Sequence, residues 1–170
     1  MIGNDVIDIL QSRLESNWQR KGFIEKLFTI EEQLLISKAV RPEIMVWMLW
    51  SMKEAAYKIY NRKTKIREYI PKKLVCSIEL QNLNSIKGNV ICSGNIYHTK
   101  TLLSKNKIHT VAVSDLKNLN KVIEIEKKSI NKDANGAPYH FDKITKTVMP
   151  VSKSHHGRFE ICVALNSIYL

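Results

Sequence analysis

The segment "WSMKEAAYK", residues 50–58, carries one carboxylate and two ammonium groups in a helical pattern. Trp50, Glu54 and Lys58 are four residues apart, so they line one stripe of a helix. As a surface ion pair, Glu54 and Lys58 would stabilise the helix by only about 0.3–0.5 kcal/mol. The surrounding residues are largely apolar, however, and a carboxylate at the edge of such a surface is expected to be paired or to bind a metal.

A second carboxylate, Asp5, lies in the N-terminal segment "MIGNDVIDI". In a strand, Asp5 shares a face with the apolar residues at positions 7 and 9, whereas Asp8 lies on the other face and is the better helix cap. Asp5 and Glu54 brought together would suit one Mg²⁺ that keeps several waters and holds phosphate oxygens. Lys58, one turn beyond Glu54, would then neutralise charge on those phosphates.

Three helices are predicted to follow the first strand and to position these groups. Asp8 caps the first, with Gln11 completing a capping box, and this helix runs to about Arg20. The second runs from Thr29, where "TIEE" is a capping-box sequence, to near residue 40, before a proline. The third runs from residue 42 or 43 to residue 61 and is the longest and most apolar.

Beyond this long helix the pattern changes to short β-rich runs separated by polar residues. The predicted strands are residues 73–80, 89–94, 95–103, 107–114, 121–128, 147–153 and 158–165. There is neither a repeat nor a linker-like segment. We therefore expect residues 1–170 to form a single α+β domain with a mainly antiparallel sheet, packed helices and one long helix that carries Lys53 and Glu54.

Composition narrows the class of protein further. The 170 residues, 44% of them hydrophobic, suffice for one real core. The longest apolar run, "IMVWMLW", is too short to cross a bilayer, and the N-terminus lacks a signal-peptide pattern, so we expect a cytoplasmic protein with no membrane partner. The three cysteines are widely separated and indicate neither a disulfide framework nor a zinc ribbon. A net charge of +11 favours an anionic partner, which could be nucleic acid, a phosphate-rich cofactor or an acidic protein.

Several motifs resemble those of the 4′-phosphopantetheinyl transferases. That family pairs a G-x-D segment on a strand with a W/F-x-x-K-E-x-x-x-K helix, which "IGND" and "WSMKEAAYK" match at Asp5, Lys53, Glu54 and Lys58. The segment "FIEKLFTIEEQLL" is similar to the family's bridging segment, "NGAPY" to its G-x-P, and "VSKSHHGRFEICVAL" to its S-x-S-H segment and following strand. Four motifs in the right order make the resemblance specific.

The motif order is similar to that of the small holo-acyl-carrier-protein synthases, because the S-H segment comes last. Two features depart from them. The region from about Lys72 to Lys128 is much longer, and its strands resemble the C-terminal sheet of the larger, two-lobed transferases. The small synthases are trimers with sites between subunits, so the insertion leaves a trimer and a monomer both open. The glycine-rich turn after the long helix is also absent, where this chain has "NRKTKIRE".

The resemblance implies transfer of 4′-phosphopantetheine from coenzyme A to a serine of an acyl or peptidyl carrier protein, releasing adenosine 3′,5′-bisphosphate. By resemblance, Asp5 and Glu54 hold Mg²⁺, and Glu54 and Lys58 are catalytic. Whether Glu54 takes the serine proton directly or through a metal-bound water stays open. The cofactor contacts implied by the resemblance are Lys53, Lys58, Ser154 and His155. His156 is expected to be a solvent-facing loop residue.

Carrier proteins are strongly acidic around the modified serine, so a basic face would steer them. Arg13, Arg20, Lys21 and Lys26 are predicted to form part of this face. Two other hypotheses stay open. A basic nucleic-acid-binding module would explain the charge, but no RNP-like, KH or helix-turn-helix signature is present, and Asp5 and Glu54 would be unexplained. A non-catalytic family member would bind coenzyme A or the carrier without transfer, although the catalytic residue types are all retained.

Overall fold

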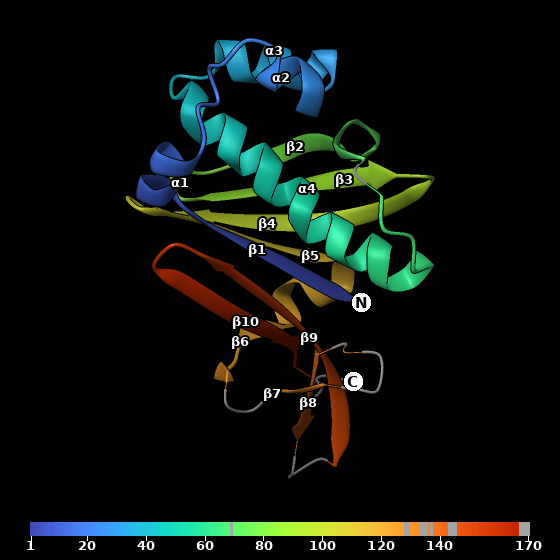
Figure 1. Ribbon diagram of the computed structural model, residues 1–170. Helices are drawn as coiled ribbons and strands as arrows, with labels where there is room; N and C mark the ends of the chain where they lie inside the picture. Colours follow the sequence, from blue (N-terminus) through green and yellow to red (C-terminus); the bar gives the residue numbers. More distant parts are fainter. Residues whose placement is uncertain (69, 128–129, 133–135, 137, 143–145, 167–170) are drawn as a thin grey trace.

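The computed structural model describes residues 1–170 except 69, 128–129, 133–135, 137, 143–145 and 167–170 (Figure 1). The helices are α1 (Ile9–Glu15), α2 (Phe23–Leu27), α3 (Ile30–Lys38) and α4 (Pro42–Thr64), with 3₁₀ turns η1 (Pro71–Lys73) and η2 (Leu116–Lys121). The strands are β1 (Ile2–Asp8), β2 (Val75–Gln81), β3 (Ser85–Cys92), β4 (Asn95–Leu103), β5 (Lys107–Val113), β6 (Val122–Glu124), β7 (Ile130–Lys132), β8 (Pro138–Asp142), β9 (Thr147–His156) and β10 (Phe159–Leu165).

The strands form two antiparallel sheets, which confirms the predicted α+β class. The first sheet has the order β1-β5-β4-β3-β2 and the second has the order β6-β10-β9-β8-β7. Most predicted strands are present, but β3 begins earlier, at Ser85, and only Val122–Glu124 of the predicted strand 121–128 is a strand among its described residues. Strands β7 and β8 were not predicted. The G-x-P resemblance falls partly on residues 135 and 137, which lie outside the described residues. The prediction of a single domain stays a prediction.

Helix α4 begins with Pro42 in its first turn and ends at Thr64, and the following Lys65 adopts a left-handed conformation with φ 63°. It lies across one face of the first sheet (Figure 1). Gly3 of β1 makes the closest approach, because a Cβ there would lie 2.0 Å from the carbonyl oxygen of Ala55. The glycine of the G-x-D segment thus lets β1 pack directly against the helix backbone. This close packing brings Asp5, two residues on, beside Glu54.

Helix α1 is shorter than predicted and ends at Glu15 instead of Arg20. Asp8 caps it by accepting hydrogen bonds from the backbone N–H groups of residues 10 and 11. The predicted reciprocal contact of Gln11 does not form, since its amide donates to Glu15 instead. Helix α3, by contrast, has the complete predicted capping box between Thr29 and Glu32.

The two faces of β1 are used as the residue alternation predicts. One face packs on α4, and Ile7 belongs to the large core around that helix. The opposite face contributes Ile2 and Val6 to a smaller core shared with Ile161 and Val163 of β10. Strand β1 therefore lies between the helix and the second sheet, which sits below the first in Figure 1.

The outer edge of β1 lies beside β9, but the two strands belong to different sheets and are joined by side chains. The backbone N–H of Asn4 donates to Ser152 Oγ (2.9 Å), and that of Asp8 donates to His156 Nδ1 (2.9 Å). Asn4 Nδ2 also donates to Ser154 Oγ (2.9 Å). We call this boundary between β1 and β9 the seam. It places the S-H segment next to the G-x-D segment.

Candidate active site

A solvent-open pocket of about 230 Å³ lies between α1, β1, α4 and the end of β9. Its lining includes Asp5 from β1, Glu54 from α4 and His155 from β9, together with Trp47 and Trp50. We call it the carboxylate pocket. The structure thus brings together three residues that the sequence placed in one site, although they lie up to 150 positions apart in the chain.

The two carboxylates of this pocket are poorly solvated. The pKa of Glu54 is raised to about 7, mainly by burial and next by the nearby Asp5 carboxylate, against a lowering effect of Lys58. The pKa of Asp5 is also raised by burial, while Lys58 and the Ser51 hydroxyl oppose this rise. Both groups would hold negative charge more readily if a further cation stood between them.

Lys58 supplies a cation at one side of this pair. Its Nζ lies 3.8 Å from Asp5 Oδ1, and the side chain is 30% exposed. The same ammonium donates to the backbone oxygens of Asn4 (2.6 Å) and Lys153 (3.3 Å), so it bridges the seam. Burial lowers the pKa of Lys58, and the two carboxylates partly restore it. The backbone carbonyls therefore fix the ammonium group beside Asp5.

The two adjacent histidines of β9 have different surroundings. His155 is exposed at the pocket, and it has no hydrogen-bond partner among the described residues. The expectation that His156 is a loop residue facing solvent is wrong, because its Nδ1 accepts from the Asp8 N–H and its Nε2 lies 3.0 Å from Glu15 Oε2. Since Nδ1 accepts, Nε2 carries the proton and donates to Glu15. His156 fastens the end of β9, which leaves His155 available to a ligand.

Asp8 fastens the same end of β9 through its carboxylate. Its side chain is 1% exposed and accepts hydrogen bonds from Nε (2.7 Å) and a terminal nitrogen (2.8 Å) of Arg158. This ion pair lowers the pKa of Asp8. The turn between β9 and β10 contains Gly157, with φ 53°, where a Cβ would lie 2.6 Å from Asp8 Oδ2. The glycine is thus required both by the turn and by the approach of the carboxylate. The sequence analysis found the cap but missed this ion pair.

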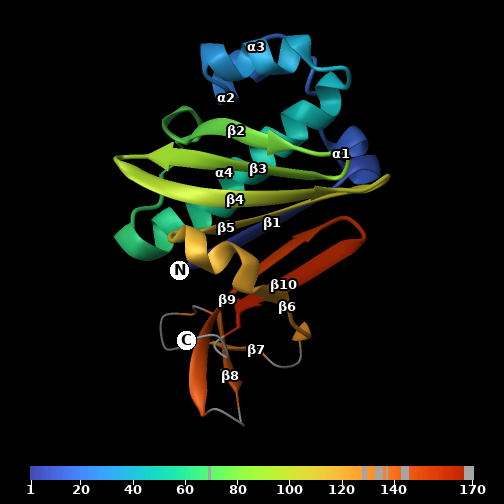
Figure 2. The same cartoon turned by 180° about the vertical axis from the view of Figure 1, so that it is seen from behind.

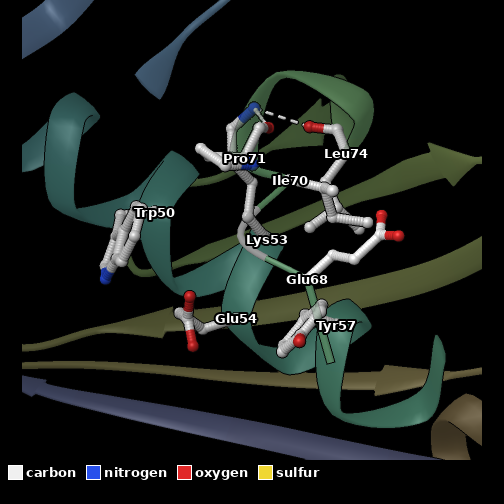
Figure 3. A pocket seen from close by; sticks show the side chains of 8 residues that line it. All are labelled: Trp50, Lys53, Glu54, Tyr57, Glu68, Ile70, Pro71 and Leu74. Atoms are coloured by element: carbon white, nitrogen blue, oxygen red, sulfur yellow. Dashed lines mark hydrogen bonds between the residues drawn. The ribbon is translucent and has the colours of Figure 1, made fainter. Parts of the chain in front are cut away.

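Two of the predicted cofactor contacts point elsewhere. Lys53 is 1% exposed and turns away from Glu54 toward η1 (Figure 3). Its ammonium donates to Glu32 Oε2 (2.8 Å) and to the backbone oxygens of Pro71 (2.8 Å) and Leu74 (2.5 Å). The hydroxyl of Ser154 is 95% buried against β1, where it accepts from Asn4. Neither side chain lines the carboxylate pocket.

Glu32 is the partner of Lys53 that the sequence analysis missed. Its two carboxylate oxygens accept hydrogen bonds from Lys53 Nζ, from Thr29 N and from Cys76 N, each 2.8–2.9 Å long. It therefore joins α3, the middle of α4 and β2. Its position in the capping box was visible in the sequence, but the pairing with Lys53 was not, because 21 residues separate the two.

Basic residues surround the turn between α1 and α2. Arg20, Lys21 and Lys26 line a shallow hollow of about 520 Å³ that also includes Phe23. The Phe23 ring packs edge-on against Trp47 of the carboxylate pocket, with ring centroids 6.2 Å apart, so the two hollows adjoin. Arg13, the fourth residue predicted for a basic face, instead forms a bidentate ion pair with Glu43, in which two guanidinium nitrogens donate to the two carboxylate oxygens.

Asp5 and Glu54 are the carboxylates of the carboxylate pocket that could bind a metal ion. Within the part of the chain that the structure describes, no three His, Cys, Asp or Glu side chains form a ligand cluster. Mg²⁺, however, usually binds one or two carboxylates together with substrate phosphates and water. Asp5 and Glu54 provide two oxygen donors whose charge is under-compensated in the free protein. The residues present therefore fit Mg²⁺ bound together with a phosphate ligand.

Comparison with known proteins gives one family. The chain matches none of the curated proteins with which it was compared. The family model of the 4′-phosphopantetheinyl transferase superfamily matches residues 1–117, which include β1, α4 and the whole first sheet. No helix among the described residues is long and apolar enough to span a membrane. With more than two thirds of its residues in this match and the two signature segments joined at one pocket, the chain belongs to the 4′-phosphopantetheinyl transferase superfamily.

Proposed function

We propose that the protein is a Mg²⁺-dependent transferase of the holo-acyl-carrier-protein synthase type. It moves 4′-phosphopantetheine from coenzyme A to a serine of an acyl or peptidyl carrier protein and releases adenosine 3′,5′-bisphosphate. The observation that carries this proposal is the pair Asp5–Glu54, two desolvated carboxylates beside Lys58 and an unengaged His155. Lys58 alone does not balance two carboxylates, and a bound metal ion would supply the missing positive charge.

The chain's own residues would divide the work by position. Asp5 and Glu54 would hold Mg²⁺, which supplies charge neutralisation at the diphosphate when bound. Lys58, fixed by two backbone carbonyls, would contact phosphate oxygens and stabilise the charge on the leaving group. Glu54 would take the proton of the attacking serine directly or through a metal-bound water. His155 would bind a phosphate of coenzyme A from the opposite wall.

The basic hollow between α1 and α2 is the proposed docking face for the carrier. It adjoins the carboxylate pocket through the Phe23–Trp47 contact, so an acidic helix bound there would present a serine close to the site. The double variant Arg20→Glu with Lys21→Glu should lower kcat/KM for the carrier at least about tenfold while KM for coenzyme A changes little. The matched control is Lys87→Glu with Lys100→Glu, two cross-strand neighbours on β3 and β4 that line neither hollow, and it should leave both constants nearly unchanged.

One chain supplies the residues of both walls of the site. Asp5 belongs to β1, Glu54 and Lys58 belong to α4, and His155 belongs to β9 of the second sheet. We therefore propose that transfer needs no residue from another subunit. The test measures specific activity while the protein is diluted to concentrations at which any oligomer dissociates into monomers. An unchanged specific activity would support the proposal, and a loss of specific activity in the monomer would contradict it.

The direct test is incubation with coenzyme A, Mg²⁺ and an acidic apo-carrier protein, followed by mass spectrometry of the carrier. The expected result is a mass increase of one phosphopantetheine that chelation abolishes. Glu54→Gln should remove the product, whereas Glu68→Gln, an exposed carboxylate at the neighbouring pocket in Figure 3, should keep it. Coenzyme A binding without any mass increase would favour a non-catalytic family member. Tight, sequence-dependent binding of nucleic acid would favour the rival module.

A further inference from the structure

A second pocket opens on the face of the first sheet that α4 leaves uncovered, where η2 lies in Figure 2. Its floor is a block of four side chains on neighbouring strands, since Lys100 of β4 pairs with Val111 of β5 and Leu102 pairs with His109. The opposite walls come from η2, β6 and β10. The cavity volume is about 230 Å³, which is below the range of drug-sized ligand sites, so only a small ligand fits. We call it the β4–β5 pocket.

Much of this pocket is apolar. Val111, Leu119 and Val163 line it from three elements and are 8%, 5% and 1% exposed. Leu102, in contrast, is 48% exposed, although it lies on the same floor. An exposed leucine next to a hollow with buried walls is apolar surface that a ligand could remove from water.

A buried histidine faces this apolar space. His109 is 8% exposed, and its Nε2 lies 3.4 Å from the side-chain nitrogen of Asn4, a donor. This contact favours the tautomer that carries its proton on Nδ1. Among the described residues no partner is found for Nδ1, and His109 lines the pocket with the little surface that it exposes. Burial lowers the pKa of His109 to about 4, so the ring is neutral near pH 7 and offers one N–H donor.

The charges around the pocket select the kind of ligand. Lys100 is next to His109 on the same floor and has no carboxylate partner among the described residues. Glu124 of β6 lies on another wall and would repel a second anionic group. We propose that the β4–β5 pocket binds a small monocarboxylate with an apolar tail. Its carboxylate would be held by Lys100 and the His109 N–H, and its tail would cover Leu102, Val111 and Leu119.

The test titrates the full-length protein with sodium octanoate and follows backbone amide shifts and binding heat. Saturable binding with a Kd of about 1 mM or lower is expected, with shifts in β4, β5 and η2. Octan-1-ol and octylamine serve as neutral and cationic probes of the same length, and both should bind at least about tenfold more weakly, because they forgo a hydrogen bond to a charged group.

Two variants locate the site. Leu102→Trp fills the pocket from an exposed position and should abolish octanoate binding, whereas Ile96→Trp, on the same strand with 49% exposure but outside the pocket, should not. Lys100→Gln should weaken octanoate about tenfold, and Lys87→Gln, its cross-strand neighbour, by much less. No saturable binding, binding unaffected by Leu102→Trp, or tighter binding of octylamine than of octanoate would each overturn the proposal. None of these readouts depends on transferase activity.

Discussion

Adjacent residues on one helix, Lys53 and Glu54, belong to two charged centres with opposite properties. Lys53 pairs with Glu32 at 1% and 0% exposure, and every oxygen and the ammonium of that pair is hydrogen-bonded. Glu54 faces Asp5 instead, and the pKa of each carboxylate is raised. The first centre is complete within the protein. The second keeps two desolvated carboxylates side by side, and carboxyl groups with perturbed pKa values are common in binding sites.

The comparison separates roles that the signature sequence presents together. In the sequence, Lys53 and Glu54 form one motif, and a basic residue beside a carboxylate suggests two contacts to the same phosphate. A helix instead directs neighbouring positions about 100° apart, so the two side chains face different elements. Buried ion pairs are costly to break but contribute little net stability over an apolar alternative. The Lys53–Glu32 pair therefore orients α3, η1 and α4, while Glu54 lines the carboxylate pocket.

The largest effect should come from breaking the satisfied pair. Lys53→Met leaves the Glu32 carboxylate buried without its cation, so the free energy of unfolding should fall by about 3–5 kcal/mol. Denaturant unfolding measures this loss. Adding Glu32→Gln to the same chain should recover part of it, because both charges are then removed. A Lys53→Met protein as stable as wild type would show that the pair does not hold the fold.

Replacing Glu54 should reduce activity strongly without reducing stability. Glu54→Gln should lower kcat for phosphopantetheine transfer at least about hundredfold, since a metal contributes several kcal/mol of transition-state stabilisation. Its melting temperature at pH 8 should equal or exceed that of wild type, because a desolvated charge has been removed. Activity assays with Mg²⁺ and thermal melts without it give the two numbers. Full activity would contradict the metal assignment.

A smaller effect is expected at the other wall of the pocket. His155→Ala should raise KM for coenzyme A roughly ten- to a hundredfold with less change in kcat, because a hydrogen bond to a charged group contributes about 1.5–3 kcal/mol. Dephospho-coenzyme A locates the contact: equal losses with both cofactors indicate the diphosphate, and loss with coenzyme A alone indicates the 3′-phosphate. An unchanged KM with both would remove His155 from the site.

The last effect concerns pH. The folded pKa of Glu54, about 7, lies above the ordinary value of 4.5, so its contribution to stability is fully present below pH 4.5 and is lost as pH rises through 7. At about 1.36 kcal/mol per pKa unit, the metal-free protein should be less stable than the Glu54→Gln variant by up to about 3 kcal/mol at pH 8, and thermal melts of the two should converge toward pH 5. Added Mg²⁺ should remove the difference at pH 8. A pH-independent difference would mean that burial does not disfavour this charge.

The sequence predicted what local pattern controls. The capping box of Thr29, the alternation along β1 and the long helix are each set by residues within one or two turns, and each is confirmed. The helix after Asp8 was predicted too long, because it already ends at Glu15, where Ser16 adopts an extended conformation with φ −141°. Strands β7 and β8 escaped prediction because they are only three and five residues long, too short to show a clear alternation of apolar and polar residues.

Prediction of the site was limited by long-range contacts. Asp5, Glu54, Lys58 and His155 were found because signature segments retain residue types at fixed spacing, and the structure brings these residues together. The neighbours of Lys53, Ser154 and His156 could not be found in this way. Their partners, Glu32, Asn4 and Asp8, lie 21 to 150 residues away and are chosen by the packing of three elements.

At the seam, side chains set the distance between β1 and β9. In a sheet, carbonyl groups set neighbouring strands about 4.8 Å apart, and no substitution changes that spacing. Along this boundary the backbone donors of β1 end on Ser152 and His156, whose side chains differ in reach. Exchanging either for a shorter or longer acceptor would therefore reset the gap by point mutation alone. The distance between β1 and β9 thus depends on side chains at this boundary, whereas inside each sheet it depends on the backbone.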